Sequence, residues 1–508
     1  MNLLSSTYVF SFFTLLSRIL GYFRDILIAI FLGASIFADA FFVAFRLPNT
    51  FRRLFAEGTF NAAFIPSYVS EKTKNQKRGK KFADEVLNIL ILILFFIILL
   101  AEIFTPYLVY LIAPGFLDDS EKFNLAVEFT RITFPFLLFV SISSFFSGIL
   151  NSNNRFAAAA AAPIILNVVL IFTLLISYFF NLDFAKQLSY GVTLSGIIQL
   201  LFLIFFTRKY YKPSIEFKIR LSSKVKFFFK KLLPSILSSG VTQINILVGT
   251  IIASFEASAV SYLYYADRIY QINLAIAGIA VGTVSLPVLS KAFKQKNILK
   301  ISNIQSRSIE LSLLLSIPAS LGLILASEEI VNALFGYGSF NIENINMTAS
   351  ALKYFGYGIP AFALIKILSN FFFARDNTKT PFYISTFVVL LNILVSITFF
   401  NKIGFIIIPI ATSISTWAGV MIYIYLLNNK NFLLLKNYLP KNILKIILST
   451  ILMSFLLMFA LDYYADYLDY TYKYKSVYLL IIVGFVASVY LISCYLTGVL
   501  KMRNFRTN

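Results

Sequence analysis

The chain has 508 residues, of which 59% are hydrophobic and 13% are charged, and its formal net charge is +21. Because soluble proteins carry about 25% charged residues, this composition excludes an ordinary soluble protein and indicates an integral membrane protein. The chain has no His and a single Cys, Cys494, which excludes the common metal sites and a disulfide framework. We therefore expect no metal and no cofactor.

The apolar runs are continuous over about 20 residues and do not alternate, which predicts spanning helices and not a β-barrel. Arg18 and Arg24 interrupt the first run, and no small-residue cleavage site follows it, so we interpret it as a span and not as a signal peptide. We expect an all-α polytopic fold with about 14 spans. Their predicted centres lie near residues 20, 45, 98, 138, 168, 197, 244, 279, 314, 361, 391, 415, 452 and 487.

The first span contains the stretch SRILGYFRD, which begins at Ser17. Gly21 and Arg24 follow Ser17 at the spacing of one helix face, and Arg18 and Asp25 are one heptad apart. This helix therefore carries charges of both signs inside an apolar run, where hydrocarbon penalises each of them.

The second span carries four ionisable residues that fall within about 40° of one another on an ideal helix. They are Asp39, Arg46, Arg53 and Glu57. Pro48 removes a backbone hydrogen bond and clashes with the Ala44 carbonyl, which predicts a kink. The freed carbonyl needs another partner, and a wet cavity supplies one most easily. The kink and the charges thus both indicate a wet cavity beside this span.

Lys and Arg are distributed very unevenly between the loops. Alternate loops place thirty basic residues on one side of the membrane and five on the other, and Lys122 is among the five. Because basic loops stay in the cytoplasm, both termini are predicted to be cytoplasmic. Topology and contact with anionic lipids account for most of the positive charge, so we expect no nucleic-acid partner.

The sequence also repeats itself. GASIFADAFFVAFRLP, from Gly33, resembles EASAVSYLYYADRIY, from Glu256, and in both copies an Arg follows the Ala-Ser pair at a similar distance. Chance similarity between apolar helices is the alternative explanation. Two six-helix lobes in a parallel pseudo-repeat are predicted, followed by an unpaired helix pair. The predicted domains are an N-lobe over 1–209, a basic cytoplasmic linker over 210–231, a C-lobe over 232–429 and a C-terminal pair over 430–508.

Duplicated helical lobes with charges between them are typical of alternating-access transporters. Arginines that face a cavity favour a phosphate or carboxylate ligand, and a diphosphate fits well. The alternative is that arginines and acids only pair with each other as interhelical clips. A third hypothesis is that four acids pair with Arg in one conformation and release it in another. These acids are Asp25, Asp39, Glu57 and Asp267.

An enzyme is the rival class. The chain has no His, no metal cluster, no G-x-x-x-x-G-K-[ST] motif and no sizeable soluble loop to enclose a reaction. We therefore expect no enzymatic activity. A scaffold that binds a lipid-linked precursor without transporting it has the same sequence features, and only a transport assay separates the two.

Five stretches of the sequence resemble motifs of the MurJ/MviN lipid II flippase family, in the multidrug/oligosaccharidyl-lipid/polysaccharide exporter superfamily. They are SRILGYFRD at 17–25, GASIFADAFFVAFRLPNTFRRLFAEGTFNAAFIPSY at 33–68, APGF at 113–116, YYADRIYQ at 264–271 and RDNTKTP at 375–381. The resemblance implies a bacterial inner-membrane protein that flips lipid II from the cytoplasmic to the periplasmic leaflet. It also implies two lobes around a cationic cavity and a C-terminal pair that forms a groove for the lipid tail.

By motif position, the resemblance implies seven functional residues for binding and four for gating or charge pairing. The binding residues are Arg18, Arg24, Arg52, Arg268, Asn49, Ser261 and Ser17. The others are Asp25, Asp39 and Glu57, together with Asp267 from the charge pattern. For Arg46 and Arg53 two interpretations stay open: they are functional residues, or they form a structural stripe that pairs with acids or snorkels. The implied partners are lipid II, membrane lipids and the cell-wall synthesis machinery.

The nearest alternative is a flippase for another polyprenyl-linked sugar, such as an O-antigen unit, and a drug exporter of the related antiporter branch comes next. Coupling to membrane potential or to a monovalent ion is expected. Some relatives use a carboxylate in the seventh span for sodium, whereas this span has no acid before Glu256. A sodium site is therefore not predicted, although Gln243, Asn245 and Asn392 offer neutral oxygens.

Overall fold

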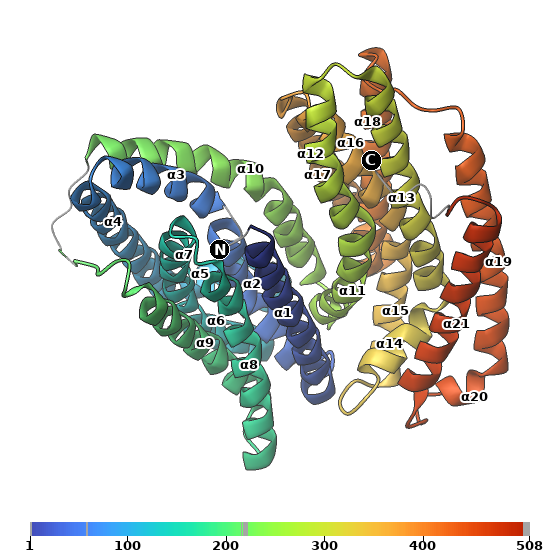
Figure 1. Ribbon diagram of the computed structural model, residues 1–508. Helices are drawn as coiled ribbons and strands as arrows, with labels where there is room; N and C mark the ends of the chain where they lie inside the picture. The colour runs from blue at the N-terminus through green and yellow to red at the C-terminus, as the bar shows by residue number, and fades with distance from the viewer. Residues whose placement is uncertain (1–2, 57–58, 215, 217–221, 501–508) are drawn as a thin grey trace. The chain divides into compact units, whose positions relative to one another are not determined.

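The computed structural model describes residues 3–56, 59–214, 216 and 222–500. All regular secondary structure in these ranges is helical, which confirms the predicted all-α fold. The helices lie in two compact units, Met1–Ser261 and Tyr262–Asn508, and each is described by itself (Figure 1).

The first unit begins with two helices that carry most of the predicted site and continues through nine further segments. They are α1 (Leu3–Leu32), α2 (Ile36–Ala56), α3 (Thr59–Lys74), α4 (Gln76–Ile103), α5 (Thr105–Ile112), η1 (Pro114–Asp118), α6 (Ser120–Thr133), α7 (Phe136–Ser152), α8 (Phe156–Phe180), α9 (Phe184–Thr207) and α10 (Ser223–Ala253). The boundary between the units falls inside α11 (Ala259–Leu274), after its first three residues.

The second unit holds the rest of α11 and the helices that follow it. They are η2 (Ala275–Ala280), α12 (Val281–Lys294), α13 (Ile298–Leu325), α14 (Ser327–Phe335), α15 (Ile342–Gly356), α16 (Ile359–Phe373), α17 (Lys379–Ile403), η3 (Gly404–Ile406), α18 (Ile407–Asn429), α19 (Leu439–Tyr463), α20 (Ala465–Leu468) and α21 (Lys475–Leu496).

Every predicted span centre lies inside one of these helices. In the described part of the chain, nine helical stretches are long and apolar enough to cross a membrane, and the bent pair α15 and α16 makes a tenth. Helices α1, α2 and α10 are not among them, and of these three α2 carries Asp39 and three arginines. The protein is thus a multi-pass membrane protein in which one expected span is unusually polar.

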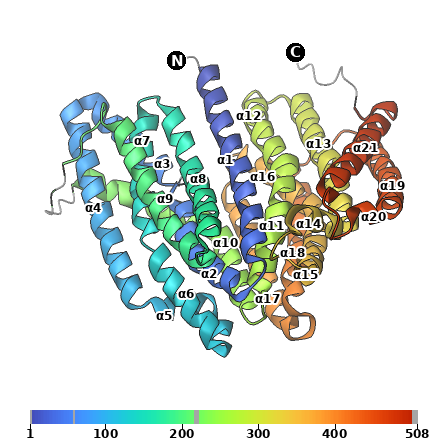
Figure 2. The same cartoon turned by 90° about the horizontal axis from the view of Figure 1, so that it is seen from below.

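Aromatic packing holds the first unit together. The buried ring of Phe64 on α3 contacts Phe82 of α4, Phe145 of α7 and Phe228 of α10. Because these rings join four helices, α10 lies along α3 inside this unit (Figure 1). On another side, α1 packs against α8, and α8 against α9 (Figure 2).

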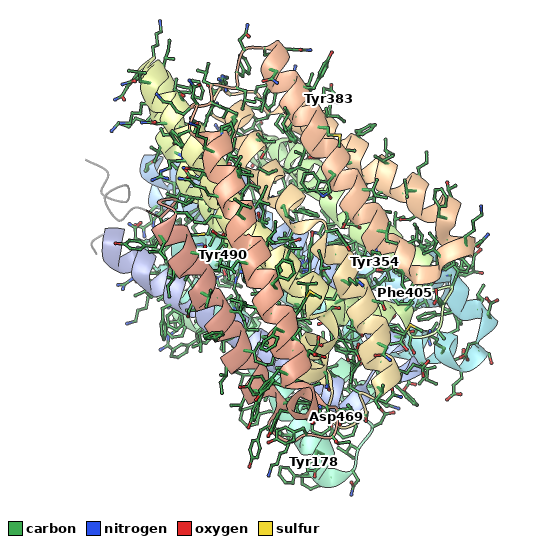
Figure 3. The ribbon with its side chains drawn as sticks, turned by 90° about the vertical axis from the view of Figure 1, so that its right-hand side faces the viewer. Tyr178, Tyr354, Tyr383, Phe405, Asp469 and Tyr490 are labelled. Atoms are coloured by element: carbon green, nitrogen blue, oxygen red, sulfur yellow. The ribbon has the colours of Figure 1, made fainter. Side chains whose placement is uncertain are left out.

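The core of the second unit forms between α13, α16 and α18, and α19 and α21 pack against α13 and each other. The buried Tyr490 of α21 donates its hydroxyl to the Leu314 carbonyl of α13 at 2.7 Å (Figure 3). The predicted domain limits, including the linker over 210–231, stay a prediction. The two compact units are defined by the packing of their residues, whereas the predicted domains follow the repeat in the sequence.

Helix α2 continues through Pro48 without a break. The freed carbonyl of Ala44 accepts a hydrogen bond from the hydroxyl of Thr133 on α6, at 3.1 Å, and both residues are fully buried. A neighbouring helix therefore satisfies this carbonyl, where the sequence had suggested a wet cavity.

Candidate functional site

A buried polar network joins α1 to α8. The guanidinium group of Arg24 donates from Nε at 2.9 Å and from Nη2 at 2.5 Å to Oδ1 of Asp25. Its Nη1 donates to Oδ1 of Asn167 at 2.9 Å. Arg24 is 5% exposed and Asp25 1%, so their charges are removed from solvent. Buried charges persist only when they are paired and hydrogen-bonded, and here both conditions are met.

The network extends to a third predicted residue. The side-chain amide of Asn167 donates to the backbone carbonyl of Ser17 at 2.9 Å. Asn167 therefore fixes the orientation of Arg24 while it ties α8 to α1. Asn167 is not one of the site residues predicted from the sequence, and nothing near it in the sequence indicated a role beside Arg24.

Two further predicted residues lie together on α2. Nε of Arg52 donates to Oδ1 of Asn49 at 3.0 Å, and both side chains are half-buried. Arg46 and Arg53 are half-buried on the same helix. Glu57 lies outside the described residues. Arg18 is exposed on α1. Each of these guanidinium groups is suited to an anionic group, because it offers paired donors to oxyanions.

Asp39, at the start of α2, is fully buried and makes three polar contacts. Its Oδ1 accepts from the backbone N–H of Ser261 at 2.9 Å and from the Ser261 hydroxyl at 2.6 Å. Its Oδ2 pairs with Nζ of Lys122 at 2.5 Å. Asp39 and Ser261 are thus brought together as predicted site residues, but the charge partner is a lysine of α6 and not an arginine.

The remaining predicted residues belong to the second unit. Nη2 of Arg268 donates to the hydroxyl of Tyr264 at 2.8 Å, and its guanidinium carbon lies 4.7 Å from the centre of that ring. Asp267 accepts a hydrogen bond from Gln271. The tyrosine holds the guanidinium group on one face of α11 and leaves its charge intact.

The second unit also contains a neutral polar cluster. Nδ2 of Asn392 donates to the Thr412 hydroxyl at 3.2 Å, and the Ser396 hydroxyl donates to Oδ1 of Asn392 at 3.2 Å. Among the described residues no group of three His, Cys, Asp or Glu has the arrangement of a metal site. Any ion bound by these three side chains would meet neutral oxygens.

Comparison with known proteins gives a consistent result. Residues 28–500 match the family described as lipid II flippase MurJ. A Rhizobium tropici protein named "Probable lipid II flippase MurJ" is 41% identical over 414 residues, which cover 80% of this chain and 78% of the relative. A Rickettsia prowazekii protein of the same name is 38% identical over 84% of each chain.

Solved structures agree. The chain is similar to a structure described as lipid II flippase MurJ in an inward closed conformation, with a TM-score of 0.82, 29% identity and coverage of 96% of this chain and 98% of the other. An inward-facing multidrug resistance MATE family transporter of the MOP superfamily shares the fold, with a TM-score of 0.67 and 14% identity, over 84% and 96% of the two chains.

Proposed function

The chain belongs to the lipid II flippase MurJ family, and we propose that it moves lipid II from the cytoplasmic to the periplasmic leaflet of the bacterial inner membrane. The match to this family over residues 28–500 is the observation that carries the proposal. Both termini are proposed to be cytoplasmic, because alternate loops carry an excess of basic residues.

The arginines of α1 and α2 are proposed to bind the diphosphate of the head group. Arg24 is preorganised by Asp25 and Asn167, and Arg52 by Asn49. A side chain held in advance loses less conformational freedom when it binds a ligand. Each charged hydrogen bond to a phosphate oxygen contributes about 1.5–3 kcal/mol. Arg268 supplies a further cation from the second half of the chain.

Transport is proposed to proceed by alternating access, in which contacts that close one side of the membrane open in the other state. Asp39 suits such a gate, because it binds the first turn of α11 through Ser261. An empty cationic cavity resists closure, so anionic substrate, membrane potential or a monovalent ion is proposed to compensate the charge.

Rescue of a bacterium depleted of its own lipid II flippase tests the function. We expect the wild-type chain to restore growth, and Arg18→Ala and Arg268→Ala to fail at equal membrane abundance. Arg208→Ala is the matched control, because Arg208 is exposed at the end of α9 and its guanidinium carbon stacks 4.0 Å from the ring centre of Phe205.

Failure of the wild-type chain to rescue growth despite correct membrane insertion would contradict the function. Full rescue by both arginine variants would retain the function and remove the arginine mechanism. A transport assay with fluorescent lipid II in vesicles separates a flippase from a scaffold, since a scaffold binds the lipid without changing its leaflet.

A further inference from the structure

Lys122 occupies a place that its sequence context does not suggest. It lies in the first turn of α6, one of the few basic residues on the predicted periplasmic side, yet only 5% of it is exposed. Its Nζ lies 2.5 Å from Oδ2 of Asp39 and 4.2 Å from the ring centre of Phe116. Both partners, Asp39 and Phe116, are fully buried, and a solvated surface lysine does not reach such groups.

The surroundings of this pair are closely packed. Phe116 is fully buried, and it belongs to the APGF stretch that forms η1. A Cβ on Gly115 would lie 2.5 Å from backbone atoms of Ser254 and Phe255, so only glycine allows this approach. The N–H of Gly115 donates to the Ser254 hydroxyl at 3.0 Å. The APGF stretch is thereby pressed against the loop that leads into α11.

The same loop is attached at a second point. The hydroxyl of Ser258 donates to the carbonyl of Ala34 at 3.0 Å, just before α2. Asp39 then binds the first turn of α11 through the N–H and hydroxyl of Ser261. A carboxylate at a helix N-terminus accepts a hydrogen bond from an N–H group that has no partner within the helix. Its negative charge also interacts favourably with the positive end of the helix dipole.

We propose that Lys122 is a positioning residue for transport, because it neutralises Asp39 and so keeps this carboxylate buried against the first turn of α11. Without the ammonium group, Asp39 would be a buried charge with only the two Ser261 donors, and burial of an incompletely compensated charge is unfavourable. The carboxylate would turn to water or take up a proton, and the start of α11 would loosen. We call the contact of Lys122, Asp39 and Ser261 the latch. Only its role in the transport cycle rests on the proposed function.

Cysteine accessibility tests the latch directly. Val260 lies beside Ser261 and is 1% exposed, so Val260→Cys in a Cys494→Ala background reports whether the first turn of α11 is docked. With a membrane-impermeant maleimide on intact cells, we expect slow labelling in this background. Lys122→Met should increase the labelling rate by about tenfold or more, since it leaves a buried charge unpaired. Lys122→Arg keeps the cation and should label close to the background rate.

Lys186→Met is the matched control. Lys186 also pairs with an acid, since its Nζ lies 2.8 Å from Oε1 of Glu128, but both side chains are more than 40% exposed. This variant should leave labelling of Val260→Cys unchanged. Asp39→Asn combined with Lys122→Met should label more slowly than Lys122→Met alone, because a neutral amide oxygen still accepts from Ser261 and needs no counter-ion.

Three results would overturn the proposal: unchanged labelling in Lys122→Met, equal acceleration in Lys186→Met, or no difference between Lys122→Met and the double variant. The melting temperature in detergent identifies a variant that is merely unfolded. If Lys122→Met is such a variant, the labelling rate of Lys122→Arg is compared with that of the Val260→Cys background instead. Labelling does not depend on lipid II, so this result is independent of whether the chain rescues a flippase-depleted strain.

Discussion

Arg24 shows how much a single uncharged residue contributes to a charged site. Asn167 accepts a hydrogen bond from Arg24 at 2.9 Å and donates one to the carbonyl of Ser17. Through these two contacts it connects α8 to the charged residues of α1. We expect Asn167→Leu to remove one acceptor from the buried guanidinium group, which costs about 1–3 kcal/mol. Transport of lipid II in vesicles should fall by about 5- to 150-fold, since 1.4 kcal/mol corresponds to a factor of ten.

Asn332→Leu is the control for this prediction. Asn332 is also a buried asparagine, and it donates to the carbonyl of Leu468 at 2.8 Å in the second unit, far along the chain from the arginines. It should lower the melting temperature without a specific loss of transport per folded molecule. Equal transport by Asn167→Leu and wild type would show that Arg24 holds its position without α8.

At the scale of elements, two prolines inside helices share a device. Pro48 of α2 and Pro318 of α13 each free the carbonyl four residues earlier. The two carbonyls accept hydrogen bonds from hydroxyls on neighbouring helices: Ala44 from Thr133 and Leu314 from Tyr490, at 3.1 and 2.7 Å. In hydrocarbon no water replaces such a donor, so each of these two prolines favours one particular helix beside it.

Thr133→Val tests this device, because it keeps the shape of the side chain and removes the hydroxyl. We expect a loss of about 0.6–1.7 kcal/mol of stability, the range found for hydrogen bonds between membrane helices. Thr398→Val should have a smaller effect, since that exposed hydroxyl only donates to Leu394 within its own helix. Thermal unfolding in detergent measures both, and equal shifts would show that the Ala44 carbonyl has another partner.

The sequence allowed the helices to be predicted because apolar runs and turn residues are local signals, and every predicted span centre lies in a helix. The partners of the charged residues were not predictable in this way. Arg24 and Asn167 are 143 positions apart, and Lys122 was indistinguishable from a loop lysine that marks the periplasmic side. Pairing between distant helices depends on packing, which composition and periodicity do not encode.

At the scale of the whole molecule, each of the two predicted lobes has an arginine that holds the segment after the last predicted span of that lobe, α9 or α18. Arg155, before α8, donates to the hydroxyl of Tyr210 after α9 at 2.6 Å. Arg375, before α17, lies with its guanidinium carbon 4.0 Å from the ring centres of both Phe293 and Phe432, the latter after α18. The equivalent positions are consistent with a parallel repeat of the two halves.

Arg375→Lys should therefore lower stability by about 1–2 kcal/mol, because an ammonium group does not stack between two rings as a planar guanidinium group does. Arg155→Lys should cost less, since its guanidinium carbon is 5.8 Å from the Tyr210 ring centre. Melting temperatures of the two variants in the same detergent make the comparison. A larger loss in Arg155→Lys would contradict the importance of stacking in the second half.

The orientation in the membrane is a property of the whole chain, because it depends on the sum of its loops. Thirty basic residues against five predict that Thr73, in the last turn of α3, is cytoplasmic, and that Leu182, between α8 and α9, is periplasmic. Both positions are exposed, and Cys494 is buried, so single cysteines at 73 and 182 should react without background. In intact cells an impermeant maleimide should label Leu182→Cys only, and Thr73→Cys should react after the cells are opened. The reverse pattern would invert every leaflet assignment, and with it the direction of transport, since the latch at Asp39 would then face the cytoplasm.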